Sequence, residues 1–182
     1  MDERQWKAFE QAALEHLEAL YGYARSLVRN PTEAEDLVQE TYLRSVKAAR
    51  ENLPAGNLKA WLFTILRHLW INRWRQQAHG PDFVPLECVD PAADELSDEW
   101  QRPDVLLEQH LLRDQIRTAI ENLDDGFREV IVLRYIEGFS YSQIAQILGC
   151  PAGTVMSRLS RARAELRRQL QHAREPRRKM VP

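Results

Sequence analysis

An acidic segment rich in proline divides this 182-residue sequence into two parts. Residues 81–104 contain eight carboxylates, one arginine and four prolines. Such a composition buries little apolar surface and resists regular structure. On either side the apolar residues follow helical spacing, so we predict an all-α protein with two small helical domains. The predicted domains cover 1–80 and 105–172, joined by a flexible acidic linker over 81–104 and followed by a basic tail over 173–182.

Composition and motifs exclude several classes of protein. Residues 1–6 open directly into amphipathic sequence, and the chain has no apolar run of about eighteen residues, so we expect a cytoplasmic protein with no membrane insertion. Cys88 and Cys150 lie far apart without CxxC or Cys/His spacing, which predicts reduced thiols and no metal site. The five histidines are scattered, and GxSxG, HExxH and GxxxxGK motifs do not occur. We therefore expect neither an enzyme nor a bound cofactor.

Long amphipathic helices are predicted at the start of the first domain. Apolar residues over 9–27 recur at spacings of three and four, which predicts one continuous helix. Thr32, with Glu35 three positions later, is typical of a capping box, so a second helix is expected from there to about Ala49. The segment 51–57 contains proline and glycine and is expected to be a loop.

The third helix, expected over 58–77, combines aromatic and basic side chains. From residue 59 to 80 there are four Lys/Arg residues and no carboxylate. No single helical face accommodates all four aromatic residues Trp61, Phe63, Trp70 and Trp74. At least one is therefore expected near solvent beside the cations, an arrangement suited to unstacked bases and phosphates. Core packing is the alternative and is favoured for Trp61 and Phe63, whereas exposed stacking is expected near Trp74.

Two helices are predicted at the start of the second domain. Apolar residues over 107–123 follow helical spacing, and Asp124 is a residue type that caps helix N-termini. The helix after Asp124 is expected to pass through Val130 and Leu133 and to stop at Gly138.

A helix-turn-helix signature is the most specific local feature of the second domain. Ser140 with Gln143 is typical of a capping box, and the helix that starts there is expected to end at Gly149. Pro151 suits the first position of the next helix, which is expected to run to about Leu170. Two helices joined by so short a turn are typical of proteins that place the second helix in a DNA major groove.

The second helix of this signature has a packing face and a basic, small-residue face. Helical spacing packs Val155, Leu159, Ala162 and Leu166 inward. It turns outward Met156, Ser157, Ser160, Arg161 and Ala164. The cations expected to neutralise phosphates are Arg158, Arg163, Arg167 and Arg168. From residue 158 to 179 nine Lys/Arg residues stand against two carboxylates, so a merely solvated amphipathic face is the weaker alternative.

Three stretches carry a family resemblance. They are AEDLVQETYLR at 34–44, NLKAWLFTILRHLWINRWR at 57–75 and FSYSQIAQILGCPAGTVMSRLSRARAELR at 139–167. In this order and around an acidic linker, they resemble the extracytoplasmic-function (ECF) class of the sigma-70 family, over roughly residues 9–170. The resemblance implies a sigma factor that binds core RNA polymerase and promoter DNA. The first stretch would dock on the clamp helices of the largest polymerase subunit, the second would melt and read the -10 element, and the third would read the -35 element.

The resemblance also assigns residues to each surface. Core polymerase binding is implied for Asp36, Leu37, Gln39 and Glu40. Binding of the -10 element is implied for Leu53, Asn57, Lys59, Trp61, Arg67, His68, Asn72, Arg73, Trp74 and Arg75. Binding of the -35 element is implied for Thr154, Met156, Ser157, Arg158, Ser160, Arg161, Arg163, Arg167 and Arg168. For the acidic residues of the first set, a solvated helix start favoured by the helix dipole is the alternative.

The sequence departs from the family pattern at two positions. The family usually has Asn where His68 stands, so the identity of the -10 bases stays open. Met156 occupies a position often taken by Arg or Lys, which leaves Arg161 as the leading polar reader of the -35 element, with guanine as its natural partner. The family further implies contact with the polymerase flap and control by an anti-sigma factor.

A stand-alone helix-turn-helix regulator is the alternative function. It would explain the second domain, but it gives no reason for the aromatic and basic helix over 58–77 in a separate first domain. It also leaves the acidic tether over 81–104 without a role.

Overall fold

The computed structural model describes residues 3–52, 54, 56–77 and 106–178, and within these ranges the chain forms helices and turns without a strand. The first half contains α1 (Glu3–Leu14), α2 (Leu17–Val28), α3 (Pro31–Glu51) and α4 (Leu58–Gln77). The second half contains α5 (Leu106–Glu121), α6 (Asp125–Ile131), the π-helical segment η1 (Val132–Ile136), α7 (Tyr141–Leu148) and α8 (Ala152–Arg178). The predicted all-helical fold is confirmed. The predicted linker over 81–104 lies outside the described residues.

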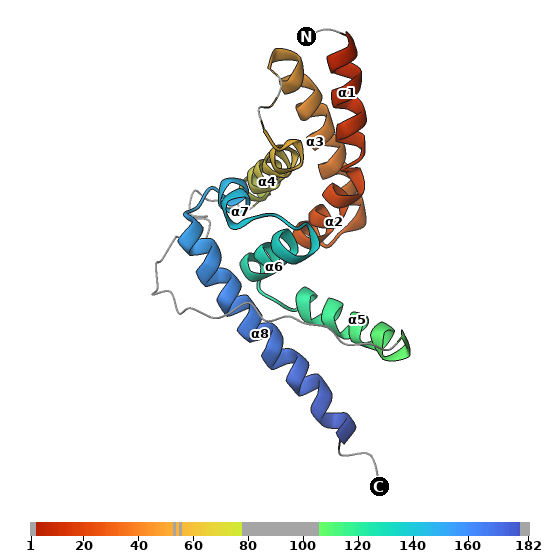
Figure 1. Cartoon of the computed structure of the whole chain (residues 1–182), viewed down its shortest axis with the longest axis vertical. Coiled ribbons are helices and arrows are strands. Elements are labelled where there is room, and N and C mark those ends of the chain that lie inside the picture. The colour runs from red at the N-terminus through yellow and green to blue at the C-terminus, as the bar shows by residue number, and fades with distance from the viewer. Residues whose placement is uncertain (1–2, 53, 55, 78–105, 179–182) are drawn as a thin grey trace.

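Figure 1 shows how the two halves meet. Helix α1 runs beside α3 in the first half, while α8 extends away from the second half toward the C-terminus. Helix α4 packs on α7, and α2 packs on α6. In the described part of the chain no helix is long and apolar enough to cross a membrane.

Two helix boundaries in the first half differ from the sequence prediction. The single helix expected over 9–27 is broken, because the His16 backbone N–H donates to the Ala13 carbonyl in a tight turn (3.2 Å) that separates α1 from α2. The capping box expected at Thr32 is also wrong. The side chain of Asn30 caps α3 instead, since its Oδ1 accepts from the Thr32 backbone N–H (2.9 Å) and Pro31 takes the first helical position.

The segment before the helix-turn-helix is more irregular than expected. The helix predicted to reach Gly138 is α-helical only to Ile131 and continues as the π-helical η1. The Asp124 side chain makes no capping hydrogen bond. Gly138 has a φ of 74°, in the left-handed region that favours glycine, and the Phe139 N–H donates back to the Leu133 carbonyl (3.0 Å). This turn sends Phe139 into the core.

The helix-turn-helix has the predicted capping. The Ser140 Oγ accepts from the Gln143 N–H (3.3 Å), and the Gln143 side chain accepts from the Ser140 N–H (2.9 Å), so the capping box is confirmed. Helix α7 ends at Gly149, whose φ of 61° is the left-handed C-cap conformation. Helix α8 begins one residue after Pro151 and runs past the predicted end.

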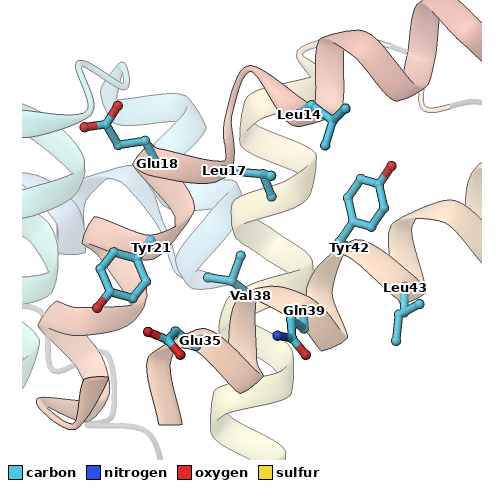
Figure 2. Close-up of a pocket in the computed structure, with 9 residues that line it drawn as sticks. All are labelled: Leu14, Leu17, Glu18, Tyr21, Glu35, Val38, Gln39, Tyr42 and Leu43. Atoms are coloured by element: carbon cyan, nitrogen blue, oxygen red, sulfur yellow. The ribbon is translucent and has the colours of Figure 1, made fainter. Parts of the chain in front are cut away.

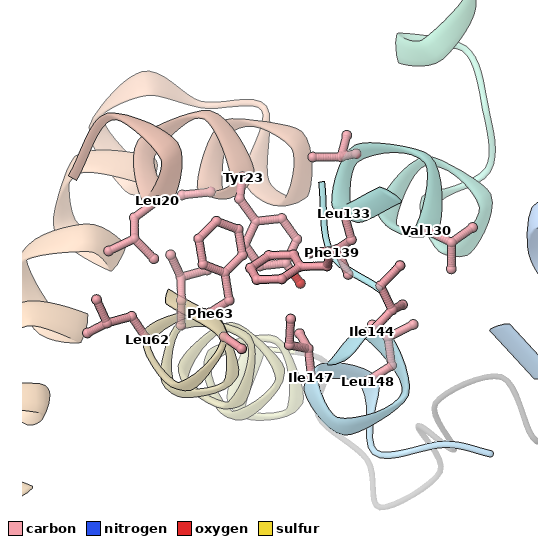
Figure 3. Close-up of a cluster of buried hydrophobic side chains, with 14 of the residues drawn as sticks. Leu20, Tyr23, Leu62, Phe63, Val130, Leu133, Phe139, Ile144, Ile147 and Leu148 are labelled. Atoms are coloured by element: carbon pink, nitrogen blue, oxygen red, sulfur yellow. The ribbon is translucent and has the colours of Figure 1, made fainter. Parts of the chain in front are cut away.

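The two halves share one apolar core, which the sequence did not predict. Figure 3 shows side chains of α2 and α4 packed against those of α6, η1 and α7. The ring of Phe63 lies at the centre: it stacks on Tyr23 with centroids 4.9 Å apart and meets Phe139 edge-on at 5.0 Å. Aromatic pairs of this kind contribute about 0.5–1.5 kcal/mol each beyond the area they bury. Of these two pairs, Phe63–Phe139 joins the first half of the chain to the second.

Candidate nucleic-acid and protein interfaces

A largely apolar groove lies between the α1–α2 junction and α3 (Figure 2). It has a volume of about 580 Å³ and is lined by Leu14, Leu17, Glu18, Tyr21, Glu35, Val38, Gln39, Tyr42 and Leu43. Leu43 is 63% exposed and Leu14 is 52% exposed, although both are large and apolar. Such exposed apolar side chains in one place are typical of a surface that binds another protein. The carboxylates of Glu18 and Glu35 add negative charge to it.

The residues expected to bind core polymerase lie on α3, partly in this groove. Asp36 and Gln39 are exposed, and Gln39 lines the groove. Glu40 is half-buried and forms an ion pair with Arg44 (2.7 Å). Leu37 is fully buried, so in this structure it cannot contact a partner. It faces inward because helical spacing places it on the same face as the buried Thr41, whose hydroxyl donates to the Leu37 carbonyl (2.7 Å).

Sequence reasoning missed the apolar part of this surface. Leu14, Leu17, Tyr42 and Leu43 were not among the expected binding residues, yet all line the groove. The sequence does indicate that Leu14 and Leu43 are exposed, because each falls outside the apolar stripe that its helix buries. Exposure alone is weak evidence of a binding surface, since isolated exposed leucines are common on proteins.

Helix α4 presents a polar face made of residues expected to bind the -10 element. His68, Asn72 and Arg75 are exposed and follow the spacing of one helical face. Trp74 is 36% exposed, as expected for an aromatic residue near solvent, and Arg73 is half-buried. The surface that we call the exposed α4 face consists of His68, Asn72, Trp74 and Arg75, with the half-buried Arg73 beside them.

Other residues of the -10 set have structural roles. The Asn57 side chain caps α4 by accepting from the Ala60 backbone N–H (2.9 Å), although the residue itself is exposed. Trp61 is half-buried and meets Phe9 edge-on with centroids 6.3 Å apart, while Phe63 is fully buried. Core packing of these two rings, the favoured alternative, is thus confirmed. Leu53 lies outside the described residues.

Two cations of the -10 set are held by the second half of the chain. Arg67 is only 8% exposed, and its Nε donates to the Glu129 Oε1 (2.9 Å). The Lys59 Nζ lies 2.8 Å from the Glu137 carboxylate and also donates to the Glu137 carbonyl (2.9 Å). Arg67 is therefore not accessible to DNA in this conformation, and its expected part in binding the -10 element stays a prediction. Its partner is 62 residues away in sequence, so no local pattern could have shown the pairing.

Glu129 accepts a second hydrogen bond across the same junction. The Tyr23 hydroxyl donates to the Glu129 Oε1 (2.7 Å). Burial, and then the neighbouring Glu129 carboxylate, raise the pKa of Tyr23 well above its usual value, so the phenol keeps the proton that it donates. The buried Glu129 carboxylate is thus bound by one cation and one hydroxyl, both from the first half.

Helix α8 shows the two faces predicted from its sequence. Val155, Leu159 and Ala162 are buried, and Leu166 is half-buried. On the outward face Met156 (47% exposed), Arg161 and Ala164 are exposed, whereas Ser157 and Ser160 are half-buried. Thr154 is buried in this conformation, and its expected contact with the -35 element stays a prediction. Thr154 is buried beside Val155, whereas Ala152 and Gly153 before it are exposed, and the Thr154 carbonyl accepts from the Ser157 hydroxyl (3.0 Å).

The four cations expected to neutralise phosphates differ in their partners. Arg167 is exposed. Arg168 is also exposed but forms an ion pair with Glu165 (2.6 Å), and the hydrogen bond from Arg168 lowers the pKa of the Glu165 carboxyl. The Arg163 Nε donates to the Tyr135 hydroxyl, and its guanidinium lies over the Tyr135 ring at 5.6 Å. Arg158 is half-buried.

Two family models match the chain. The model of sigma-70 region 2 matches residues 13–80, and that of sigma-70 region 4 matches residues 113–166. A curated relative, the ECF RNA polymerase sigma factor EcfG of Rhodopseudomonas palustris, is 36% identical over 81% of this chain and 77% of its own. The chain belongs to the ECF class of the sigma-70 family. In this sigma factor, region 2 contains the groove and the exposed α4 face, and region 4 contains the helix-turn-helix.

Solved structures of other sigma factors share the fold. One is the sigma factor RpoE in complex with the anti-sigma factor NepR from Bartonella quintana, with 34% identity, a TM-score of 0.66, and coverage of 91% of this chain and 98% of that one. Another is CnrH in complex with the cytosolic domain of CnrY, with 28% identity, a TM-score of 0.62, and coverage of 91% and 89%.

Proposed function

We propose that this sigma factor uses three separate surfaces in promoter-directed transcription. The groove and the polar residues of α3 bind core RNA polymerase, the exposed α4 face binds the -10 element, and the outward face of α8 binds the -35 element. The observation that carries the proposal is the presence of both sigma-70 regions in one chain. A stand-alone helix-turn-helix regulator needs the second region only. On this proposal the chain acts by binding, and its place is the cytoplasm, where polymerase and promoter DNA meet.

The α3 surface suits a basic, amphipathic helical partner. Leu14 and Leu43 offer apolar area, while Asp36 and Glu35 offer carboxylates beside it. Charges at the rim of an interface steer the encounter, and apolar side chains at its centre supply most of the affinity. The clamp helices of the largest polymerase subunit are the partner that we propose for this surface, with the flap as a second contact for region 4.

The two DNA surfaces differ in the kind of contact that they offer. On α8, Arg161 stands among small side chains, so it can reach a base edge and donate two hydrogen bonds to guanine. On α4, Trp74 offers a ring for an unstacked base, beside the cations Arg73 and Arg75. Duplex recognition upstream and binding of melted bases downstream together describe the reading of a promoter.

An anti-sigma factor is the proposed regulatory partner. One structural relative was solved with the anti-sigma factor NepR, and the other with the cytosolic domain of CnrY. The match to this chain covers 98% of the first relative's chain and 89% of the second's. The exposed apolar residues Leu14 and Leu43 give such a protein a surface on region 2 for which it would compete with polymerase.

Charge reversal on α3 tests the polymerase surface. Asp36→Arg is expected to prevent co-elution with core polymerase and to abolish run-off transcription from fragmented genomic DNA of the source organism. The helical circular dichroism spectrum should be retained, because Asp36 is exposed. Glu51→Arg is the matched control, since it makes the same charge change at the exposed far end of α3. If Asp36→Arg still co-elutes as the control does, the proposed docking surface is wrong.

A further inference from the structure

Helix α1 brings aromatic rings to the two helix ends on either side of the segment 52–57. The Arg50 guanidinium, in the last turn of α3, lies over the Trp6 ring at 5.1 Å from its centroid. Trp6 lies beside Phe9 with ring centroids 5.7 Å apart, and Phe9 meets Trp61 edge-on at 6.3 Å. We call these four side chains the α1 row. The row is continuous from the end of α3, through α1, to the first turn of α4.

The α1 row is anchored in the core at its centre and reaches solvent at its α3 end. Phe9 is 6% exposed and belongs to the apolar core, and Trp6 and Trp61 are half-buried against that core. Arg50 is exposed. A cation within about 6 Å of an indole ring centroid is attracted by the negative face of the ring. The contact with Trp6 therefore holds the end of α3 against α1, while the aromatic packing holds α1 against α4.

Hydrogen bonds connect both ends of the α1 row to the segment 52–57. The Asn52 backbone N–H donates to a carbonyl one turn back in α3 (2.9 Å). At the other end, the Trp61 backbone N–H donates to the Asn57 carbonyl (3.1 Å), and the Asn57 side chain caps α4. A shift of either helix end would move Asn52 or Asn57 with it. The positions of these two residues are thus set by the helices that the α1 row holds together.

Two members of the α1 row lie outside the part of the chain that the region 2 family model matches. That model matches residues 13–80, so Trp6 and Phe9 precede it, and the other two members lie within it. Asn57 also lies within the match and is one of the residues expected to bind the -10 element. The α1 row therefore links a segment before the matched region to a residue of the expected DNA surface.

We propose that Trp6 is a positioning residue for recognition of the -10 element. Together with Arg50 it holds the end of α3 and the start of α4 at a fixed separation, and this separation places Asn57 against the DNA. The inference rests on the proposed binding of the -10 element by region 2. Contact groups discriminate best when neighbouring side chains lock their geometry, and a misplacement of about 1 Å is enough to weaken them. Trp6 thus contributes to the choice among -10 bases without touching them.

Transcription from two promoter libraries tests the proposal with the full-length protein and core polymerase of the source organism. Both libraries are built on a start site that run-off transcription of fragmented genomic DNA identifies for the wild type. One library is randomised over the -10 element and the other over the -35 element. The base preference is the ratio of transcript from the best base to transcript from the worst at each position. Lys7→Ala is the matched control for Trp6→Ala, because Lys7 is the next residue of α1, is exposed, and forms an ion pair with Glu3 of the same helix (2.9 Å).

We expect Trp6→Ala to reduce the preference at the -10 base that Asn57 contacts by about tenfold, because the cation contact and the packing on Phe9 are both lost. The preferences over the -35 element should stay as in the wild type. Lys7→Ala should match the wild type in both libraries. Co-elution with core polymerase should be retained in both variants, since neither Trp6 nor Lys7 lines the groove on α3.

Conservative substitutions separate positioning from simple packing. Trp6→Phe keeps an aromatic face for Arg50 and should keep most of the -10 preference. Trp6→Leu keeps apolar volume only and should lower the preference about twofold to fivefold, the range expected for loss of an exposed cation–π contact. Arg50→Gln should give the same decrease, and the double variant with Trp6→Leu should be no worse than either single variant, because both remove one contact.

Arg50→Gln has its own matched control and also guards against misfolding. Lys47→Gln removes the same charge from an exposed residue one turn earlier on α3, and it should behave as the wild type. If Trp6→Ala loses helicity by circular dichroism, Arg50→Gln replaces it as the test, since Arg50 is exposed and its substitution should change the free energy of unfolding little.

Two kinds of result would overturn the proposal, and they have different meanings. If Trp6→Ala and Arg50→Gln leave both preferences unchanged, or lower transcription equally for every -10 and -35 sequence, the α1 row only stabilises the fold. The proposed role of region 2 at the -10 element is then unaffected. If the wild type itself shows no base preference over the -10 library but does over the -35 library, region 2 does not read this element, and the inference falls together with that part of the proposed function.

Discussion

Removal of the Phe139 ring should separate the unfolding of the two halves. Phe139 is 3% exposed and belongs to the second half, but its ring packs edge-on against Phe63 of the first half and under the Lys59 ammonium. A buried Phe→Ala substitution costs about 3–5 kcal/mol, to which the aromatic pair contributes about 0.5–1.5 kcal/mol. Domains of this size have a total free energy of unfolding of about 5–15 kcal/mol, so the loss is a large fraction of that stability.

The tryptophans make this prediction measurable. Trp6, Trp61, Trp70 and Trp74 all belong to the first half, so in a Trp100→Phe background the fluorescence reports on that half alone. Far-ultraviolet circular dichroism reports on helices of both. In urea, the wild-type transitions by the two probes should coincide because the core is continuous. In Phe139→Ala, helicity should begin to fall at a lower urea concentration than the fluorescence does.

A control within the second half completes the design. Leu159 is equally buried but lies on α8, which packs on α5, α6 and α7. Leu159→Ala should cost about 2–5 kcal/mol and shift both transitions together, because the junction stays intact. If Phe139→Ala leaves both midpoints unchanged, or shifts them together as the control does, the halves are not coupled through this ring.

Three further predictions concern single side chains. Arg161→Ala should cost about 1–3 kcal/mol of binding free energy at one base pair of the -35 element and relax the base preference there. Arg167→Ala should instead weaken binding to all sequences alike and lower the slope of log affinity against log salt concentration by about one. Transcription from a randomised -35 library separates the two outcomes, and a uniform loss of activity for Arg161→Ala would make Arg161 a phosphate contact. Trp74→Ala should weaken binding of single-stranded DNA by about 1–3 kcal/mol through loss of base stacking, as measured by fluorescence anisotropy of a labelled oligonucleotide. Unchanged anisotropy would exclude stacking at this position. Ser140→Ala should lower the free energy of unfolding by about 0.5–2 kcal/mol through loss of the cap on α7, and a urea midpoint equal to that of the wild type would show that the cap contributes nothing.

Local sequence determined most of the secondary structure, because its signals act between residues a few positions apart. The capping box at Ser140, the end of α7 at Gly149 and the full extent of α4 all agree with the prediction. The helix boundary predicted wrongly at Thr32 also depends on neighbouring residues. Asn30 competes with Thr32 for the same orphan N–H groups, and Asn30 becomes the N-cap because Pro31 takes the first helical position directly after it.

The packing faces of α8 and the core role of Phe63 were likewise predictable, since helical spacing decides which side chains share a face. The binding groove was only partly predictable. Gln39 was expected at a protein surface, but Leu14 comes to it from another helix, and sequence spacing cannot place two helices side by side.

Only the tertiary structure decided which cations are available to bind DNA. Arg67 and Arg75 belong to the same helix and have the same chemistry, yet one is buried against Glu129 and the other is exposed. Glu129 stands in what the sequence presents as a different domain. Its position beside Arg67 results from the shared core around Phe63, where burial of aromatic surface brings together residues that are distant along the chain. The hydrophobic effect has no direction, so a sequence shows that such surface will be buried but not which partner will cover it.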